Sequence, residues 1–397
     1  MELFVLGFTL LDIILLLVLL FYLIAGLRNG LVVTLGGIVG FVGGAVAAFF
    51  AIPLVAGWVP DNGWRLTVVI ATAVILVLAG HAAGAALGGT IRRWLNFPPL
   101  RFLDRVLGGA VNLVVAALVM AMLAFSVTTL GVPYLSQQIA ASRVLGSIDD
   151  ATPEQVKAWS AQIRSFTVSE GLPTILDSAA PQSVVPPSAE VDSPALRAAS
   201  ASVLKITGTA YQCGQNQTGS GFVVADDRVL TNAHVVAGVN EPVVEVPDGS
   251  VLPGRVVYFD SARDLAVLAV NNLDAPALPL GQPLDDGSTA AFAGYPAGGP
   301  FRLQAASVEG LSQVSVRDIY GSAPQVLEVY TLAANVQQGN SGGPLLDMDG
   351  SIAGVIFAKT TGDQPIGYAL SLAEAGPVIE AAPGYTQPVS AGQCTSK

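Results

Sequence analysis

Apolar residues dominate the first third of the chain and are interrupted only by short polar turns. Four long apolar segments follow one another, at residues 3–25, 31–55, 66–87 and 106–130. Each approaches or exceeds the ~20 residues that a helix needs to cross a bilayer. A cleavable signal peptide would account for the first segment alone, and that segment lacks a basic start. The pattern therefore predicts a four-helix transmembrane domain over residues 1–132.

The arginines of the short loops predict which side of the membrane each loop faces. The first loop contains Arg28, and the third is flanked by Arg92, Arg93, Arg101 and Arg105. Because basic residues are retained on the cytoplasmic side, we expect both loops there. The N-terminus and everything after residue 132 are then expected on the extracytoplasmic, or periplasmic, side of the plasma membrane.

Small and polar residues inside these segments suggest how the helices pack. Glycine recurs at every fourth position in the second and third segments, at Gly36, Gly40, Gly44, Gly80, Gly84 and Gly88. Such a stripe lets helix backbones approach closely. A carboxylate in lipid is costly, so Asp12 either serves a function or bonds a partner near the interface. We expect His81 to make a packed polar contact.

Beyond residue 200 the apolar residues occur in short runs bounded by Gly, Asp, Asn and Pro. Runs typical of strands lie at residues 203–207, 221–224, 229–231, 256–258 and 265–268. Many short strands between turn residues predict an all-β domain, a barrel or sandwich, over residues 200–397, with one short helix at 372–381.

Residues 133–199 connect the two predicted domains. Thr152 followed by Pro153 is typical of a helix start. One face of that helix would carry Val156, Trp159, Ile163 and Phe166. Residues 178–193 are rich in Pro, Ser and Ala, so we expect a linker that is open to proteolysis.

Composition narrows the classes of partner. Hydrophobic residues make up 52% of the 397 residues and charged residues only 12%, which the apolar segments explain. The formal net charge of −11 argues against a nucleic-acid partner, because nothing would neutralise the phosphates. We expect neither a metal nor a cofactor. The two cysteines, Cys213 and Cys394, both lie in the predicted extracytoplasmic region, where disulfides persist, so we expect them to pair; two free thiols are the alternative.

Residues 338–344 read Gln-Gly-Asn-Ser-Gly-Gly-Pro and place Ser341 in a glycine-rich loop. Alone, such a cluster is more often an ordinary turn. However, His234 is the only histidine outside the apolar segments, and Asp264 stands immediately before a predicted buried strand, with Asp260 as its competitor. The order His, Asp, Ser is one of the orders in which a catalytic triad occurs. Backbone N–H groups of Gly339 and Ser341 could then stabilise an oxyanion.

Several runs resemble known families. Residues 218–223, 230–236, 264–268, 339–344 and 366–370 resemble the HtrA-like branch of trypsin-fold serine proteases, over about residues 200–380. Residues 11–14, 26–30 and 103–109 resemble the colicin V production (CvpA) membrane family, over about the first 130 residues. A fusion of this kind without a PDZ domain is similar to the membrane-anchored acid-resistance proteases of mycobacteria. The resemblance implies a protease that cleaves proteins or peptides of the cell envelope under acid or oxidative stress.

The trypsin-like resemblance also implies a fold of two six-stranded barrels with the active site between them. His234, Asp264 and Ser341 would form the triad, and the oxyanion loop would comprise Gly339, Asn340 and Ser341. Trypsin-like zymogens carry an aspartate at the position of Asn340, and an amide cannot make that ion pair. We therefore expect control by ordering of the loop rather than by zymogen cleavage.

The position of Asn335 matches the base of the primary specificity pocket, and Phe357, Ala358 and Lys359 match its wall. Without a carboxylate at the base, we expect a preference for uncharged side chains. Two other classes of function remain open: a membrane transport or assembly protein whose β-domain is regulatory, and a catalytically silent binding module.

Overall fold

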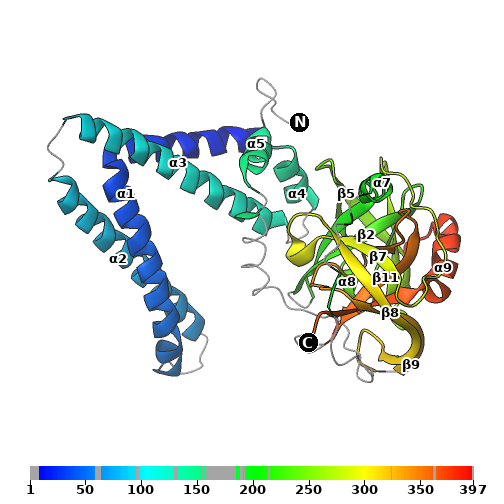
Figure 1. Cartoon of the computed structure of the whole chain (residues 1–397). Helices are drawn as coiled ribbons and strands as arrows, with labels where there is room; N and C mark the ends of the chain where they lie inside the picture. The colour runs from blue at the N-terminus through cyan, green and yellow to red at the C-terminus, as the bar shows by residue number, and fades with distance from the viewer. Residues whose placement is uncertain are drawn as a thin grey trace. The chain divides into compact units, whose positions relative to one another are not determined.

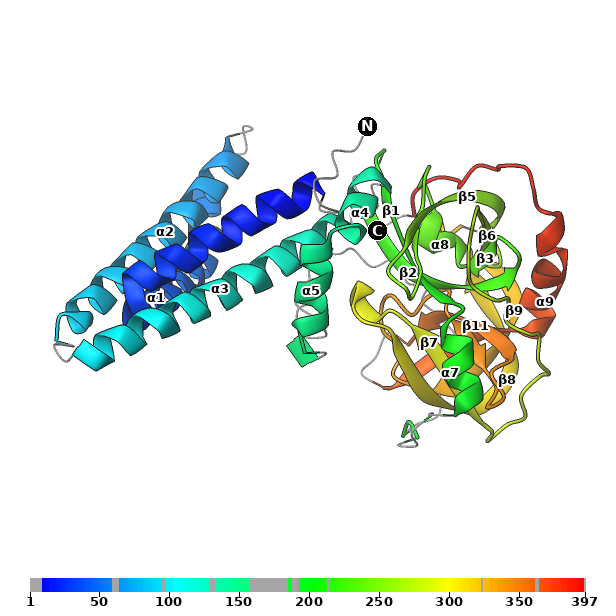
Figure 2. The same ribbon diagram turned by 90° about the horizontal axis from the view of Figure 1, so that it is seen from above.

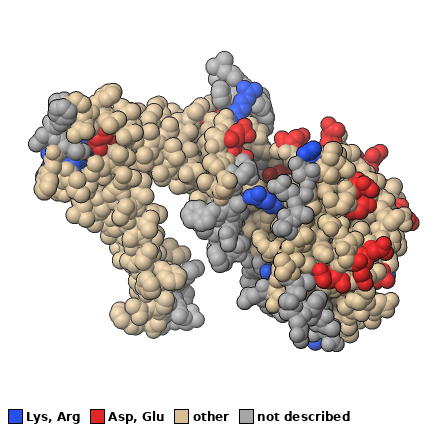
Figure 3. Space-filling model, viewed as in Figure 1, with Lys and Arg blue, Asp and Glu red and all other residues tan. Residues whose placement is uncertain are grey.

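The computed structural model describes residues 9–58, 64–94, 98–128, 133–153, 155–156, 185–187, 191, 193–212, 215–322, 324–360 and 364–395. The chain divides into two compact units, Met1–Ala121 and Met122–Lys397. The first is helical, and the second is built mainly of strands (Figure 1). The face shown in Figure 3 has most of its acidic side chains on the second unit, whereas the first presents mainly uncharged surface.

Three long helices make up the first unit: α1 (Leu10–Trp58), α2 (Arg65–Arg92) and α3 (Pro98–Thr128). Within the described residues, each contains a stretch that is long and apolar enough to cross a membrane. The stretch in α1 covers 46 residues, about twice what one crossing needs. Large apolar side chains on these helices are exposed, as expected for a surface that faces lipid.

A break at Gly30 divides α1 into two helical halves. Gly30 has φ 76° and ψ 169°. These values lie outside the helical region, and glycine adopts them readily because it has no side chain. The first two predicted segments are thus joined through one non-helical residue, and the short loop expected between them is absent from this described part of the chain. Each half is long enough for a crossing, so the number of crossings depends on this break.

The break is held by polar side chains from the other two helices. Asp104 of α3 accepts hydrogen bonds from Val32 N through Oδ1 (3.0 Å) and from Arg92 Nε through Oδ2 (2.8 Å). Arg92 also donates to the carbonyl of Arg28 (2.9 Å). Backbone groups that the break removes from the helix ladder are therefore satisfied locally. This gives a structural role to the residues that resemble the colicin V production family.

The glycine stripes pack against each other where α1 meets α2. A side chain on Gly40 would collide with the carbonyl of Gly80, and one on Gly84 would collide with the carbonyl of Gly36. The close backbone approach expected from the four-residue spacing is confirmed.

Asp12 and His81 have structural partners. Asp12 is buried and accepts hydrogen bonds from the backbone N–H (2.9 Å) and hydroxyl (3.0 Å) of Thr9, whose Oγ1 in turn accepts from Asp12 N. This reciprocal arrangement caps the start of α1. Nδ1 of His81 lies 3.1 Å from the carbonyl of Gly37, which is the packed polar contact expected.

Short helices precede the strands of the second unit: α4 (Pro133–Ala140), α5 (Arg143–Ala151) and α7 (Pro194–Ser200). The predicted helix start at Thr152 falls at the end of α5, where the hydroxyl of Thr152 donates to the carbonyl of Ile148 (2.6 Å). Most of the predicted helix beyond it, including Trp159 and Ile163, lies outside the described residues.

Six strands form a first closed barrel in the order β1-β2-β3-β6-β5-β4. They are β1 (Val203–Ala210), β2 (Gln215–Ala225), β3 (Arg228–Thr231), β4 (Val243–Glu245), β5 (Val251–Asp260) and β6 (Leu265–Val270). All neighbouring strands are antiparallel. Closure removes exposed sheet edges and encloses a core of Val, Leu, Ile and Ala side chains.

Six further strands form a second closed barrel in the order β10-β11-β12-β9-β8-β7. They are β7 (Thr289–Gly294), β8 (Arg302–Arg317), β9 (Pro324–Ala333), β10 (Pro344–Leu346), β11 (Ile352–Lys359) and β12 (Ile366–Ser371). The helix predicted at 372–381 is present as α9 (Leu372–Ala381) and begins at the N-cap Ser371. The described tail runs back from α9 over the first barrel (Figure 2), where Val389 N donates to the carbonyl of Val256 (2.9 Å).

Candidate active site

His234 lies in α8 (Ala233–Val236), a single helical turn that follows β3 after one residue. That residue, Asn232, is buried and donates from Nδ2 to the backbone carbonyl of Asp264 (2.7 Å). The turn that carries the histidine is thereby tied to the turn that carries the aspartate. Nothing in the sequence around Asn232 indicates this contact, although Asn232 lies inside the run that resembles the HtrA-like branch.

Asp264 is buried immediately before β6, as predicted, and has a positive φ of 56°. Its Oδ2 lies 2.6 Å from Nδ1 of His234, and its Oδ1 accepts the backbone N–H of His234 (2.8 Å). An ionised carboxylate only accepts hydrogen bonds, so its position assigns the proton to Nδ1 and leaves Nε2 as the basic nitrogen. The two contacts fix the backbone and the ring of His234 together.

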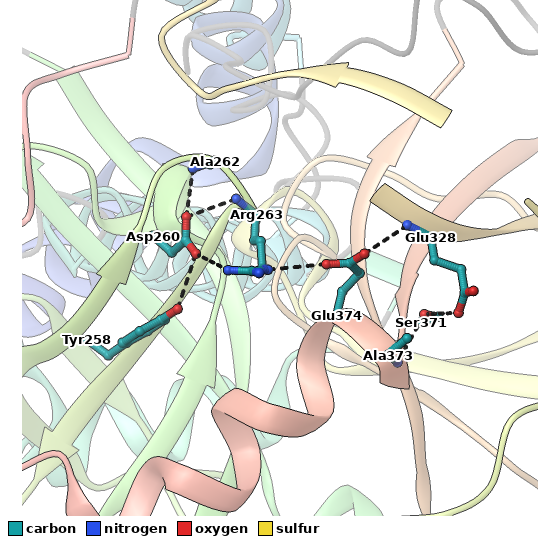
Figure 4. A network of polar contacts seen from close by, with 8 residues as sticks. All are labelled: Tyr258, Asp260, Ala262, Arg263, Glu328, Ser371, Ala373 and Glu374. Carbon is teal, nitrogen blue, oxygen red and sulfur yellow. Dashed lines mark hydrogen bonds and ion pairs between the residues drawn. The ribbon is translucent and has the colours of Figure 1, made fainter. Parts of the chain in front are cut away.

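Asp260, the competing carboxylate, is engaged elsewhere (Figure 4). It accepts hydrogen bonds from the backbone of Ala262 (2.9 Å) and Arg263 (3.1 Å), from Tyr258 Oη (3.2 Å) and from the Arg263 guanidinium (3.0 Å). Arg263 also contacts Glu374 of α9 (3.3 Å). This network fixes the turn just before Asp264 against the helix that follows the second barrel. Asp264, and not Asp260, is therefore the carboxylate that contacts His234.

The network changes the pKa values of its members. Burial raises the pKa of Asp260, but hydrogen bonds from Arg263 and Ala262 and the guanidinium charge outweigh burial, so the pKa is lowered overall. Burial and the neighbouring Asp260 charge raise the pKa of Tyr258 to about 12. Asp260 is thus ionised, and Tyr258 neutral, across the physiological range.

We expect Asp260→Asn to lower the free energy of unfolding at pH 7 by about 1.5–3 kcal/mol, the range for hydrogen bonds to a charged group. A lowered folded-state pKa contributes stability above the ordinary value of 3.8, and this contribution is lost as the pH falls through the folded value. The difference from the native chain should therefore shrink between pH 5 and 3, as measured by denaturant unfolding of the full chain in detergent. Asp274→Asn, at an exposed position, is the control. A difference that stays constant down to pH 3 would contradict this role.

Ser341 sits in a tight loop between two residues of positive φ, Gly339 (89°) and Gly342 (80°). A side chain on Gly342 would collide with Thr231 Oγ1 and approach the backbone N of Asn232 to 2.9 Å. The serine loop of the second barrel therefore abuts the segment of the first barrel that leads into His234. Among the described residues, Oγ of Ser341 is buried and has no hydrogen-bond partner, so its bond to His234 is not formed here. Such bonds are often long in the absence of substrate.

Asn340 is fully buried, and its Oδ1 accepts the backbone N–H of Gln337 (2.9 Å). The amide oxygen thus closes the oxyanion loop locally. Within the described part of the chain, Nδ2 of Asn340 has no partner. Control by ordering of this loop stays a prediction.

The residues expected at the specificity pocket differ in burial. Phe357 and Ala358 are fully buried, Lys359 is partly buried, and Asn335 is exposed. The exposed side chain of Asn335 differs from the buried base of a specificity pocket that its position in the sequence predicts. Its neighbour Val336 is buried and would collide with a side chain at Gly367. The role of Asn335 therefore stays a prediction.

Cys394 is disulfide-bonded. Its Sγ lies near Gly238, where a side chain would approach it to 2.9 Å, just beyond the turn that carries His234. Cys213 lies outside the described residues, so its pairing with Cys394 stays a prediction.

Comparisons with known proteins agree with this architecture. The trypsin-like peptidase domain family matches residues 219–355, and the Colicin V production protein family matches residues 11–153.

Individual proteins also resemble this chain. Serine protease Rv3671c of Mycobacterium tuberculosis is 36% identical over 321 residues, which cover 79% of this chain and 79% of its own. A probable periplasmic DegP-like serine endoprotease of Halomonas elongata is 34% identical over 39% of this chain and 32% of its own. The active-form crystal structure of Rv3671c protease matches with a TM-score of 0.52 at 38% identity, over 56% of this chain and 100% of that chain.

Fold and sequence together define a serine endopeptidase with a trypsin-like domain and a membrane-associated domain of the Colicin V production type. The chain belongs to the family of the mycobacterial serine protease Rv3671c.

Proposed function

We propose that this endopeptidase hydrolyses proteins and peptides of the cell envelope through a triad of His234, Asp264 and Ser341. The main support for this triad is the buried carboxylate of Asp264, which is hydrogen-bonded to both Nδ1 and the backbone N–H of His234. This pair lies beside a serine loop built on glycines of positive φ. A histidine held in one tautomer beside a serine is the arrangement that activates a hydroxyl as a nucleophile.

In the proposed reaction, Oγ of Ser341 attacks the carbonyl carbon of the scissile peptide bond, and its proton passes to Nε2 of His234. Asp264 stabilises the imidazolium and is not itself protonated. His234 then gives the proton to the leaving amine, which leaves an acyl-enzyme ester on Ser341. Water hydrolyses the ester by the same steps, with His234 again as base and then as acid.

Charge develops on the carbonyl oxygen in both halves of this reaction. Backbone N–H groups of Gly339 and Ser341 are proposed to hold it. Each such donor contributes ~3 kcal/mol to lowering the barrier, because it is oriented before the reaction starts. Asn340, between them, closes the loop through its contact with Gln337 (2.9 Å).

The substrate is proposed to lie along β11. Pairing of β10 with β11 ends at Val355, whereas β12 continues to pair as far as Lys359. A peptide could add beside the last residues of β11 by backbone hydrogen bonds. With Phe357 and Ala358 buried behind it and no carboxylate at position 335, uncharged side chains are the proposed preference.

We further propose that four crossings anchor the protease on the extracytoplasmic side of the plasma membrane. The break at Gly30 gives α1 two spanning halves, and α2 and α3 supply the others. Arg28 and Arg92, joined through a hydrogen bond of 2.9 Å, lie at the same end of these helices, which the basic-residue rule assigns to the cytoplasm. A role in acid or oxidative stress is part of the proposal.

A transport or assembly function is the second candidate, and the Colicin V production match over residues 11–153 favours it. The features that would support transport have structural roles, because Asp12 caps α1 and the glycine stripes pack α1 against α2. A catalytically inactive β-domain would favour the transport or assembly function.

The test is labelling of the full chain in detergent with a fluorophosphonate probe, beside a Ser341→Ala variant. We expect the native chain alone to be labelled, on Ser341. Labelling of neither chain from pH 5 to 8 would sink the proposed chemistry and favour transport or binding. Equal labelling of both would place the nucleophile elsewhere.

A further inference from the structure

The orientation of the proposed oxyanion donor depends on a turn that lies outside the nucleophile loop. Ala297, in the short helix η1 (Pro296–Gly298) after β7, donates from its backbone N to the carbonyl of Gln338 (2.6 Å). In a planar trans peptide the C=O of one residue and the N–H of the next point in opposite directions. The contact with Ala297 therefore directs the N–H of Gly339 away from this turn, where a substrate carbonyl could meet it.

Gly339 could not hold this orientation alone. Its φ of 89° lies in the region that glycine visits freely, so the backbone has little intrinsic preference here. Ala297 has a positive φ of 53°, which is unusual for alanine and requires support from neighbours. Two adjoining segments of the second barrel thus depend on contacts from elsewhere.

Ser220 of β2, in the first barrel, supplies these contacts. Its Oγ accepts the N–H of Tyr295 (2.9 Å), just before the turn, and donates to the carbonyl of Gly339 (2.6 Å). Its backbone N donates to the carbonyl of Ser341 (2.8 Å). One fully buried serine therefore bonds the β7 turn, the oxyanion glycine and the nucleophile residue.

The residues around the Ser220 hydroxyl leave room for these hydrogen bonds. A side chain at Gly294 would approach Oγ of Ser220 to 2.6 Å and Nδ2 of Asn340 to 3.1 Å, so glycine leaves room for the contact. The carbonyl of Ser220 accepts Thr231 Oγ1 (2.7 Å), which ties it to the strand leading to His234. The backbone N, the carbonyl and both functions of the hydroxyl are thus engaged.

We propose that Ser220 is a positioning residue, whose hydroxyl holds the Gly339 and Ser341 N–H groups in register with the histidine side of the active site. The inference rests on the proposed function. Without Oγ, the carbonyl of Gly339 and the N–H of Tyr295 would be buried without partners, and rotation of the glycine peptides would relieve this. Misplacement by about 1 Å is enough to cost ~100-fold in rate.

Ser220→Ala tests the proposal, with the full chain in detergent and the fluorophosphonate probe. We expect the maximal labelling rate constant to fall ~10- to 100-fold, while the apparent probe affinity and the pH midpoint of labelling stay unchanged. The final fraction labelled should also stay complete. A purely structural defect would lower that fraction through loss of folded protein and leave the rate constant of the remainder unaltered.

Ser371→Ala is the matched control. Ser371 is also a buried serine whose hydroxyl donates one hydrogen bond, to Glu328 (2.7 Å), and accepts one, from Ala373 N (3.2 Å). It caps α9, so its loss should lower stability and leave the labelling rate constant unchanged.

The outcomes separate the two proposals. If the native chain is not labelled on Ser341, the proposed function fails and this inference fails with it. If it is labelled, and Ser220→Ala reacts at the native rate or no more slowly than Ser371→Ala, the positioning role alone is overturned.

If Ser220→Ala does not fold, Ser220→Cys replaces it, because the cysteine thiol is a weak donor of similar size. We expect an intermediate rate constant, and a native rate would overturn the proposal.

Discussion

Asp264→Asn is expected to lower the fluorophosphonate labelling rate by about 10⁴-fold with the fold intact, because it reverses the tautomer of His234. The backbone N–H of His234 needs an acceptor, which Oδ1 now provides at 2.8 Å. The amide oxygen of the new asparagine would take that place, so its NH₂ group would face Nδ1. Nδ1 would then become the acceptor and Nε2 would carry the proton, leaving no base for Ser341.

The substitution suits the backbone as well as the chemistry. Asp264 has a φ of 56°, and asparagine is enriched at positive φ, so little strain is added. The unfolding midpoint should stay close to that of the native chain, which separates lost catalysis from lost structure.

Asp260→Asn is the comparison, because both aspartates flank the same turn. We expect its labelling rate to fall less than about tenfold, the effect of slightly loosening a supporting network, and its main effect to be on stability. The reverse ranking, with Asp264→Asn nearly normal and Asp260→Asn inactive, would assign the orienting role to Asp260. The contact of 2.6 Å between Asp264 and Nδ1 argues against that ranking.

The parts of the site predictable from sequence were those with local signals. His234 was the only eligible histidine, Asp264 preceded an apolar run, and Ser341 stood among glycines. Their chain order added a constraint that a turn-forming cluster alone lacks. In the structure Asp264 is hydrogen-bonded to His234, whereas the hydroxyl of Ser341 has no hydrogen-bond partner among the described residues.

Residues that act through non-local backbone contacts were not predictable. Ser220 is separated from Gly339 by 119 positions, and nothing in its own neighbourhood indicates that its hydroxyl reaches that carbonyl. The positive φ of Ala297 is likewise hidden, because alanine has no preference for it. A Pro-Ala-Gly-Gly run at 296–299 predicts a turn, but not which loop the turn supports.

The lengths of the apolar segments predict the long helices, but not that the first two join into one helix with a break at Gly30. Glycines at positions 26 and 30 in the run Gly-Leu-Arg-Asn-Gly suggest a loop, yet the helix continues through Arg28, whose carbonyl accepts a hydrogen bond from Arg92 (2.9 Å). Only Gly30 leaves the helical region, where Asp104 takes over the N–H of Val32 (3.0 Å). Side chains from two other helices decide the geometry, so local pattern cannot.

Gly339→Ala is expected to lower the labelling rate by about 10²- to 10³-fold, the effect of losing one oxyanion donor. An alanine Cβ at φ 89° would collide with the carbonyl of Tyr295 and approach Ala297 N to 2.9 Å. The β7 turn would have to withdraw, which breaks the bond from Ala297 to Gln338 (2.6 Å) and frees the peptide whose N–H is the proposed donor.

The matched control is Gly249→Ala, because Gly249 has nearly the same φ, 85°, and no atom lies within 4 Å of a Cβ there. Both variants carry the cost of placing alanine in the left-handed region, roughly 1–2 kcal/mol. We expect similar backbone strain in both, a somewhat lower unfolding midpoint for Gly339→Ala because of the collision, and a native labelling rate only for Gly249→Ala. If the two variants react with the probe equally fast, the donor is not Gly339, and the oxyanion would have to be held by the N–H of Ser341 and groups outside this loop.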